Sequence, residues 1–328
     1  MNIHGIGIAA SGGRIDGRLA QLADDLACFE ALGFEVAEIS VPGTSVVVNG
    51  CLHRLQVERI KETLARFRLR YTAHAPNRLN LAYSTDHGKE RAIFAACLEF
   101  CAAIGAPMLV YHSGLQALDG VRAGIAPVLN AAALEAGAER EVAALKELAP
   151  MAAHLGVTIA VENGDPHLWE YALLARYSVP ASALPAHHAR LRIPPIVQQL
   201  EAVNQPYVGL TLDVGHLFIA ANTLGFDYLD AVAEAAPWVR HLHVSDNFGT
   251  LDVGFEAESD RLPYGEADLH LPPGWGNIPL AETLACLPDY EGDLILEIKP
   301  RYWEHLGLAL ANTRALLAQV LSREVEDL

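Results

Sequence analysis

The sequence contains no apolar run long enough to cross a bilayer, and no basic segment precedes its first apolar residues. The first absence excludes a transmembrane helix. The second makes the opening Met-Asn-Ile-His-Gly-Ile-Gly-Ile a first β-strand rather than a signal peptide. Low-complexity tracts are also missing, and the 18 prolines and 26 glycines are spread along the chain, so no domain boundary is marked. We expect a soluble, cytoplasmic protein.

Cysteine is scarce, with five residues scattered through apolar sequence. An odd number in such surroundings favours reduced, buried thiols over disulfides, as in a cytoplasmic protein. Cys97 and Cys101 stand four residues apart in an Ala-rich helical segment. We interpret them as core residues, because thiolate metal ligands usually come in tighter pairs with more partners.

Basic residues are few: 23 stand against 40 acids, which gives a formal charge of -17. That field repels polyanions unless a local basic groove offsets it. Arg66, Arg68 and Arg70 come nearest to a basic cluster, and we interpret them as a solvated helix end that leads into a strand. A nucleic-acid partner is therefore disfavoured.

The 328 residues, 52% of them hydrophobic, can bury a large core. Apolar strand-like runs alternate with amphipathic helical patterns such as 18–32, 58–67, 90–104, 139–155 and 228–236. The strand-like runs lie near 3–8, 35–41, 69–74, 107–112, 157–162, 208–213, 239–244 and 293–298. Eight such units predict a (β/α)8 TIM barrel, an α/β fold.

We expect residues 1–328 to form one barrel domain with two long loops. A minimal barrel needs roughly 250 residues, so the remainder must lie in loops. These extra residues lie in two stretches, at about 164–196 after strand five and at about 245–277 after strand seven. An open doubly wound sheet is the alternative, but Ala10-Ser-Gly-Gly-Arg14 does not fit the G-x-G-x-x-G turn that it would need.

The predicted strand six, Val208-Gly-Leu-Thr-Leu-Asp-Val-Gly-His216, ends in an acid and an imidazole that can bind a divalent cation. A single Asp-x-x-His is weak evidence, because a turn Asp and a solvated His are commoner. The signal gains weight because strand after strand ends in the same kind of residue. Five of the 14 histidines and four carboxylates lie at or just beyond such strand ends, with Asp268 and His270 in the loop after strand seven: His74, His112, Glu162, Asp213, His216, His243, Asp268, His270 and Glu297.

A barrel gathers such strand ends above its centre, however far apart they are in the sequence. Imidazole and carboxylate suit zinc, manganese, iron or magnesium, and nine groups exceed the needs of one ion. Two or three metals could be held. Buried carboxylates without a cation would be costly, and Lys299 and Arg301 cannot neutralise all of them. His241, one step deeper than His243, is interpreted as a hydrogen-bonded structural residue.

These residues resemble the xylose isomerase-like TIM-barrel superfamily, which includes the sugar phosphate isomerase/epimerase family and endonuclease IV, or AP endonuclease family 2. The resemblance extends from strand one to strand eight. Its most specific segments are "HAPNRLNLA" at 74–82, preceded by one further Ala, "GLTLDVGH" at 209–216 and "DLHLPPGWGNI" at 268–278.

The resemblance implies the roles of individual residues. Endonuclease IV holds three zinc ions, and all nine strand-end residues match its ligand pattern. In the isomerases and epimerases, the positions that match Glu162, Asp213, His243 and Glu297 hold one manganese or similar ion. There the two glutamates also transfer protons, and the position of His216 contacts substrate.

Three departures weaken the DNA-repair interpretation. Asn77 stands where the nuclease motif has an aromatic residue that enters DNA, Thr211 replaces the usual Cys, and the segment between His243 and Asp268 is longer. The loop sequence from Asp268 onward instead resembles the isomerase/epimerase-like proteins.

We therefore expect a metal-dependent isomerase or epimerase that acts on a sugar or sugar derivative through an enediolate. Glu162 and Glu297 would transfer protons as catalytic residues, and His216 and Lys299 would orient substrate oxygens. Trp275 could stack on the sugar or simply pack. One to three divalent ions, manganese or zinc, are implied as cofactors.

Two alternatives stay open. One is an endonuclease IV-like phosphoester hydrolase with a multinuclear metal site, and the other is a non-catalytic barrel that holds no metal tightly. The expected partner is a small sugar-like molecule, not a nucleic acid or a membrane. Chain length and apolar outer helices permit a homo-oligomer without requiring one.

Overall fold

The computed structural model describes residues 1–83, 88–124, 126–252 and 258–326. Eight parallel strands close into a barrel in the order β1-β10-β9-β8-β7-β6-β5-β2, which confirms the predicted TIM barrel. The barrel strands are β1 (Asn2–Ala10), β2 (Val36–Ser40), β5 (Arg70–His74), β6 (Met108–His112), β7 (Thr158–Glu162), β8 (Val208–Asp213), β9 (Val239–Val244) and β10 (Glu291–Leu296). A separate hairpin pairs β3 (Val47–Val48) with β4 (Cys51–Leu52).

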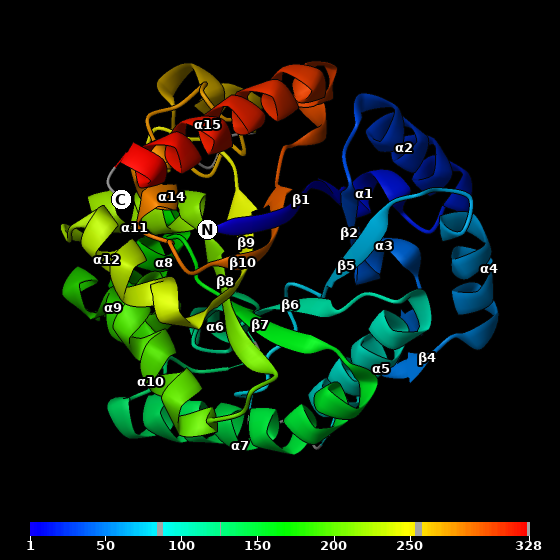
Figure 1. The fold of residues 1–328 in the computed structure, drawn as a ribbon. Helices are drawn as coiled ribbons and strands as arrows, with labels where there is room; N and C mark the ends of the chain where they lie inside the picture. The colour runs from blue at the N-terminus through cyan, green and yellow to red at the C-terminus, as the bar shows by residue number, and fades with distance from the viewer. Residues whose placement is uncertain (84–87, 125, 253–257, 327–328) are drawn as a thin grey trace.

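Helices surround the strands, as Figure 1 shows in a view along the barrel. The α-helices are α1 (Gly12–Ile15), α2 (Leu19–Leu32), α3 (Val41–Thr44), α4 (Arg54–Leu64), α5 (Lys89–Ile104), α6 (Leu118–Arg122), α7 (Ala131–Leu155), α8 (Leu168–Arg176), α9 (Leu184–His187), α10 (Ile193–Val203), α11 (Val214–Leu224), α12 (Tyr228–Ala235), α13 (Glu258–Arg261), α14 (Leu280–Ala285) and α15 (Leu306–Glu326). Short 3-10 helices are η1 (Ala181–Ala183), η2 (Ala189–Leu191), η3 (Ala236–Trp238), η4 (Leu262–Tyr264) and η5 (Pro300–His305). Among the described residues, none of these helices is long and apolar enough to span a membrane.

The strands are buried on both faces, which is why they appear in the sequence as short continuous apolar runs. Every residue of β8 is buried, from Val208 to Asp213.

The helix starts were harder to predict because polar caps set them. α7 begins at Ala131, ahead of the predicted residue 139, because the side chain of Asn130 accepts a hydrogen bond from Ala133 N.

The interpretation of the cysteines is confirmed in part. Cys97 and Cys101 are buried in the core, as expected. Cys28 and Cys51 are exposed, so the prediction of buried thiols was wrong for both. Cys28 lies on a face of α2 that the core does not cover, and Cys51 lies in the β3–β4 hairpin outside the barrel. The apolar neighbours of these cysteines in the sequence do not indicate their exposure, because successive residues of a helix or strand point to different faces.

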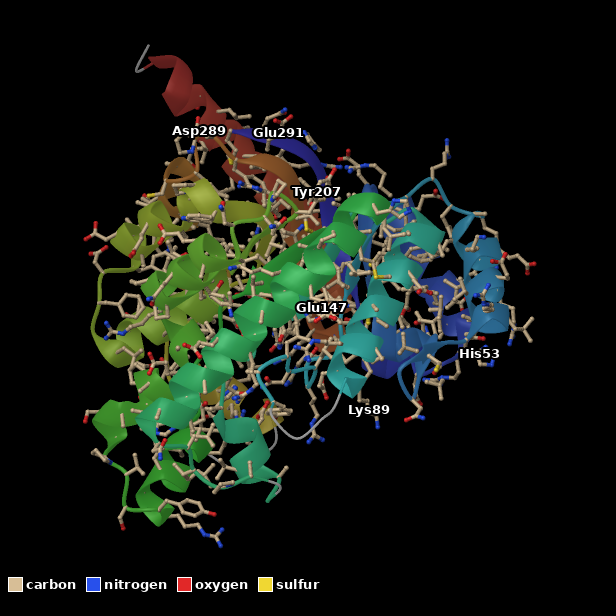
Figure 2. All side chains as sticks on the ribbon, turned by 90° about the horizontal axis from the view of Figure 1, so that it is seen from below. His53, Lys89, Glu147, Tyr207, Asp289 and Glu291 are labelled. Atoms are coloured by element: carbon tan, nitrogen blue, oxygen red, sulfur yellow. The ribbon has the colours of Figure 1, made fainter. Side chains whose placement is uncertain are left out.

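The two stretches expected to hold the extra length follow the carboxyl ends of barrel strands. After β7 the chain forms α8, η1, α9, η2 and α10, and after β9 it forms α13 and η4 before α14. Residues 253–257 of the second stretch lie outside the described residues. Figure 2 views the molecule from the side: Asp289 and Glu291, near the start of β10, lie towards one end, and Lys89, at the start of α5, lies towards the other.

Two short helices after β1 and β2 pack through glycine at the carboxyl end of the barrel. A Cβ on Gly43 of α3 would lie 2.6 Å from the Cα of Gly12 in α1. Ser11 caps α1 by accepting a hydrogen bond from Arg14 N, and Ser40 caps α3 by accepting one from Gly43 N. The two helix starts are therefore held at a backbone-to-backbone distance that only glycine allows.

This packing predicts a difference between two glycine substitutions. Gly43→Ala should lower the free energy of unfolding by about 1–3 kcal/mol, the usual cost of overpacking. Gly13→Ala, in the partner helix α1 and next to Gly12, is the control: its added Cβ would have nothing within 4 Å, so stability should hold or rise by up to about 1 kcal/mol. Urea denaturation measures both, and equal stability of the two variants would contradict the packing argument.

Candidate metal centre

The pairing register of the barrel places the predicted residues side by side at one rim. His112 is the partner of Glu162 between β6 and β7, and Asp213 is the partner of His243 between β8 and β9. Registered residues on neighbouring parallel strands point to the same face of the sheet. Each pair therefore projects the same way at the carboxyl end of the barrel, where TIM-barrel active sites lie.

Asp213 and His216 owe their spacing to a helix start. Asp213 ends β8 and is the N-cap of α11, and its Oδ1 accepts a hydrogen bond of 2.7 Å from His216 N. Capping uses one carboxylate oxygen and leaves Oδ2 for another partner. The ring of His216 is turned back towards the rim, where its Nδ1 lies 3.2 Å from Asn163 O. The Asp-x-x-His pattern is thus a cap and a first-turn residue facing one site.

All nine predicted residues converge in three groups that are each compact enough to hold one metal ion. Within each group, one nitrogen or oxygen atom per residue lies within 4.8 Å of the others. The groups are His74, His112 and Glu162; Glu162, Asp213, His243 and Glu297; and His216, Asp268 and His270. Glu162 belongs to two of them.

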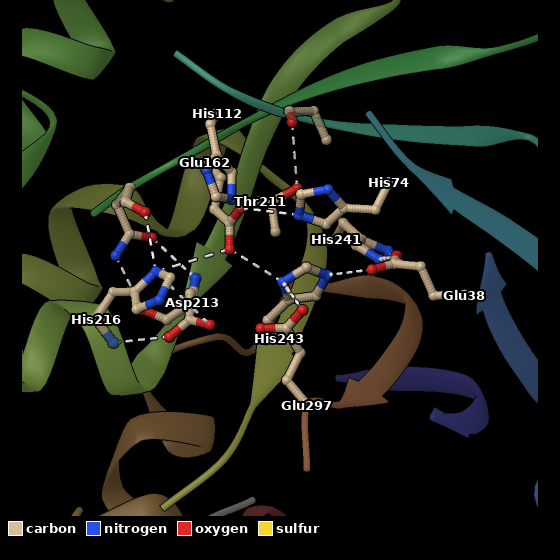
Figure 3. A network of polar contacts seen from close by, with 12 residues as sticks. Glu38, His74, His112, Glu162, Thr211, Asp213, His216, His241, His243 and Glu297 are labelled. Carbon is tan, nitrogen blue, oxygen red and sulfur yellow. Dashed lines mark hydrogen bonds and ion pairs between the residues drawn. The ribbon is translucent and has the colours of Figure 1, made fainter. Parts of the chain in front are cut away.

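The carboxylate of Glu162 lies between two sets of imidazoles. Its Oε2 is 2.8 Å from His112 Nε2 and 3.5 Å from His74 Nε2. Its Oε1 is 3.1 Å from His243 Nδ1. Figure 3 shows the rings of His112 and His243 on different sides of this carboxylate. One buried acid thus connects β5, β6, β7 and β9.

The third group is joined to the other two through Glu297. His216 Nε2 lies 3.4 Å from Asp268 Oδ2, and His270 Nε2 contacts the same oxygen. His270 Nδ1 lies 3.7 Å from Glu297 Oε2. The backbone of His270 has a φ of 46°, a left-handed conformation that is uncommon outside glycine. The loop is therefore held in a conformation that turns this imidazole into the cluster.

Burial and crowding shift the protonation of the cluster. Burial, with a further contribution from Glu297, Asp268 and Glu162, raises the pKa of Asp213 to about 7. Burial also opposes the charge on Glu162, but His112 and His243 outweigh it and hold the pKa of Glu162 well below its ordinary value. Burial lowers the pKa of His112 to about 4, so its ring is neutral at pH 7. Burial also opposes the charge on the other four histidines, but the neighbouring acids outweigh it and raise the pKa of His74, His216, His243 and His270. Metals bind neutral imidazole and ionised carboxylate, so a cation bound here would displace protons from these rings.

Unsatisfied buried oxygens show that a cation fits this donor set. Among the described residues, Asp213 Oδ2 and Asp268 Oδ1 are buried and have no hydrogen-bond partner. Buried oxygens of this kind are costly unless a partner compensates them. A divalent cation bound by carboxylate and imidazole supplies that partner, and these ligands suit zinc or manganese. The residues therefore fit the implied metal.

Lys299 and Trp275, the two predicted substrate-binding residues, have different surroundings. Lys299 Nζ donates a hydrogen bond of 2.6 Å to Asp268 O. Lys299 also lines a cavity of about 220 Å³ together with His74, His270 and Glu297. Trp275 packs against Tyr302 and His305, with 37% of its surface exposed. Trp275 thus has a packing role, and its predicted contact with a sugar stays a prediction.

Sequence reasoning missed the residues that support the centre. Glu38 of β2 is buried, and its Oε2 lies 2.9 Å from His241 Nε2, the partner that the structural interpretation of His241 required. Asp246 accepts hydrogen bonds from the backbone N–H groups of Asn247, Gly274, Gly276 and Ile278. It thereby ties the loop that carries Asp268 and His270 to β9. A lone acid inside the apolar run 36–39 was the available signal for Glu38.

Comparison with known proteins agrees with this architecture. No curated protein matches the sequence significantly. Among solved structures, the fold is similar to a D-tagatose 3-epimerase-like protein (TM-score 0.68, 17% identity, 97% of this chain and 99% of that one). It is also similar to D-psicose 3-epimerase from Clostridium cellulolyticum H10, solved with D-tagatose (0.64, 15%, 95% and 99%). A third similar structure is the IOLI protein with a bound zinc atom (0.62, 18%, 97% and 98%).

The family model described as "Xylose isomerase-like TIM barrel" matches residues 27–319, a range that contains all nine residues of the cluster. The match covers most of the barrel and both loops that follow β7 and β9. The chain therefore belongs to the xylose isomerase-like TIM-barrel family.

Proposed function

We propose that the protein is a metal-dependent epimerase or isomerase of a sugar or sugar derivative. The observation that carries the proposal is the convergence of Glu162, Asp213, His243 and Glu297, with one ligand atom of each within 4.8 Å of the others. The similar folds include a D-tagatose 3-epimerase-like protein and a D-psicose 3-epimerase, which supports this class of substrate. A cavity of about 220 Å³ beside the cluster suits a small molecule better than a polymer.

A bound divalent cation would act as a Lewis acid on neighbouring carbonyl and hydroxyl oxygens of the substrate. Glu162 ends β7 and Glu297 follows β10, and β8 and β9 lie between these strands, so the two carboxylates reach the centre from different sides. One glutamate removes the proton from the carbon beside the carbonyl, and the electron pair forms the enediolate. The other returns a proton to the opposite face, which inverts that carbon.

Polar groups of the chain orient the substrate in this mechanism. His216 faces the centre from the first turn of α11, and Lys299 lines the cavity beside Glu297. Both can hold substrate oxygens by hydrogen bonds. Zinc and manganese are the proposed ions, because the donor set combines imidazole with carboxylate.

Replacing either glutamate by its amide tests the mechanism. Glu162→Gln and Glu297→Gln should each lower kcat for ketohexose epimerisation by roughly 10²–10⁴-fold, because each removes a proton-transfer group. Glu147→Gln is the matched control, since Glu147 lies on the outer face of α7 (Figure 2) with its side chain 66% exposed. Polarimetry on a panel including D-tagatose and D-psicose gives the rates, and deuterium uptake from solvent reports carbon deprotonation. Full activity in both variants would refute the two-glutamate mechanism.

A specific observation favours a second function, a phosphoester hydrolase with a multinuclear metal site. The groups around His112 and around His270 are each compact enough for a further ion. Several metals in one site can hold the attacking and leaving oxygens of a phosphoryl transfer. The formal charge of -17 argues against a polyanionic substrate such as DNA. We therefore place this function second.

Counting metals separates the two functions. The epimerase proposal predicts one tightly held ion per chain, with no loss of that ion in His112→Asn, because His112 lies outside the four-residue group. The hydrolase predicts three ions, one of which His112→Asn would lose together with phosphodiesterase activity. Elemental analysis after gel filtration measures the count. Three ions with cleavage of a phosphodiester or of abasic DNA would replace our first proposal by the second.

Metal binding should stabilise the fold, and more so at higher pH. A cation present at about a thousand times its Kd adds about 4 kcal/mol to the free energy of unfolding. As the pH falls through about 7, Asp213 binds a proton that competes with the metal, so the gain should shrink. Thermal unfolding of chelator-treated protein, with and without Zn²⁺ or Mn²⁺ at about pH 8 and about pH 6, measures both effects. An unchanged Tm at both pH values would contradict a metal centre.

A further inference from the structure

Glu38 and two histidines form a buried polar contact on the far side of His243 from Glu162. Glu38 lies in β2, and its side chain is 1% exposed. Its Oε2 lies 2.9 Å from His241 Nε2 and accepts a hydrogen bond of 3.0 Å from the hydroxyl of Thr72. Figure 3 shows His243 between Glu38 and Glu162. Glu38 therefore contacts the candidate metal group through the ring of His243, and it also lines the cavity beside Glu297.

The two nitrogens of His243 face two different acids. Nδ1 faces the candidate metal group, 3.1 Å from Glu162 Oε1 and 3.5 Å from Glu297 Oε1. Nε2 lies 3.0 Å from Glu38 Oε1. Among the described residues, His243 Nε2 and Glu38 Oε1 are buried and neither makes a hydrogen bond of good geometry, although they lie in ion-pair contact with each other. Each is thus the nearest available partner of the other.

This arrangement decides which nitrogen can bind a metal. Both nitrogens face a carboxylate, but a cation bound with Glu162, Asp213 and Glu297 would need the lone pair of Nδ1, so the proton of His243 would then be on Nε2, facing Glu38 at 3.0 Å. Nδ1 is then the nitrogen left for a cation in the group with Glu162, Asp213 and Glu297. A carboxylate that holds the second nitrogen of a metal-binding histidine fixes its ring and raises its basicity.

We propose that Glu38 is a positioning residue: it fixes the ring orientation and tautomer of His243 and so strengthens metal binding at Glu162, Asp213, His243 and Glu297. The inference rests on the proposed metal centre and deepens it. Glu38 does this without contacting the metal. His241 and Thr72 hold the second oxygen of Glu38 and keep its carboxylate turned towards His243.

Glu38, His241 and His243 are also close enough to bind an ion of their own, with one atom of each within 4.8 Å of the others. Their N···O distances of 2.9 and 3.0 Å are those of hydrogen bonds. One oxygen of Glu38 is already engaged by His241 and Thr72, and the ring of His243 turns its Nδ1 towards Glu162 and Glu297. A role in support of His243 is therefore favoured, and the experiment below separates the two roles.

The test compares metal affinity in two buried-glutamate variants. Glu38→Gln should weaken Zn²⁺ or Mn²⁺ binding by about 10–100-fold, measured by competition with a chromophoric chelator. Glu141→Gln is the matched control, because Glu141 is equally buried but interacts with Tyr111, Ser113 and Gly114. The affinity of this control should stay at the wild-type value. Circular dichroism of the metal-free proteins checks folding in each case.

At saturating metal, Glu38→Gln should hold as many ions per chain as the wild type. The loss of one ion would make Glu38 a ligand and overturn the positioning role, and wild-type affinity in this variant would overturn it as well. If Glu38→Gln does not fold, Thr72→Val, which removes one hydrogen bond to Glu38, should still weaken metal binding several-fold. Unchanged affinity in that variant would then reject the inference.

Failure of the inference can be told from failure of the proposed function. Wild-type protein that binds no divalent cation would reject the metal centre, and with it the role of Glu38. Wild-type protein that binds metal tightly, alongside a Glu38→Gln variant of equal affinity, would reject the role of Glu38 alone.

Discussion

The candidate metal centre depends on one buried carboxylate that several imidazoles share. The two oxygens of Glu162 face His112 and His74 on one side and His243 on the other. An acid with its side chain 1% exposed keeps its charge only when such partners offset the cost of leaving water. The same contacts set the spacing of the rings around it. The contacts around Glu162 therefore set both the positions of the rings and the charge of the carboxylate.

The barrel strands and the loop after β9 hold the residues of this centre with different rigidity. His74, His112, Glu162, Asp213 and His243 end or belong to barrel strands, whose register is set by backbone hydrogen bonds. Asp268 and His270 lie in a loop that is tied to the end of β9 by three backbone N–H groups, those of Gly274, Gly276 and Ile278, which donate to Asp246. Sites on strands are held more precisely than sites on loops. His74, His112, Glu162, Asp213 and His243 are accordingly held by the more rigid part of the scaffold.

The same residues support two chemistries, which is why fold alone does not assign the activity. Under the two proposed functions, four of them would hold one ion for enediolate chemistry, and all nine would hold a cluster for chemistry on phosphate esters. The two functions differ in the number of metal ions bound at the site, and they suit different net charges and shapes of its surroundings. A strongly acidic chain and a small cavity beside Lys299 both favour a small substrate.

The sequence by itself determined the barrel and the identity of the residues at its rim. Buried parallel strands must be apolar, so each appeared as a short run, and an acid or imidazole directly after such a run stood out at Glu162, Asp213 and His243. Helix starts such as Ala131 and the exposure of Cys28 were less predictable, because caps and helix faces set them locally.

Only the tertiary structure decided which residues share a partner. Glu38 and His241 are separated by 203 positions, and their contact crosses from β2 to β9. Strand periodicity says which face a side chain takes but not what lies opposite it, because that depends on the closure and stagger of the whole barrel. For the same reason the division of nine residues into three groups, with Glu162 common to two, could be seen only once the barrel had closed.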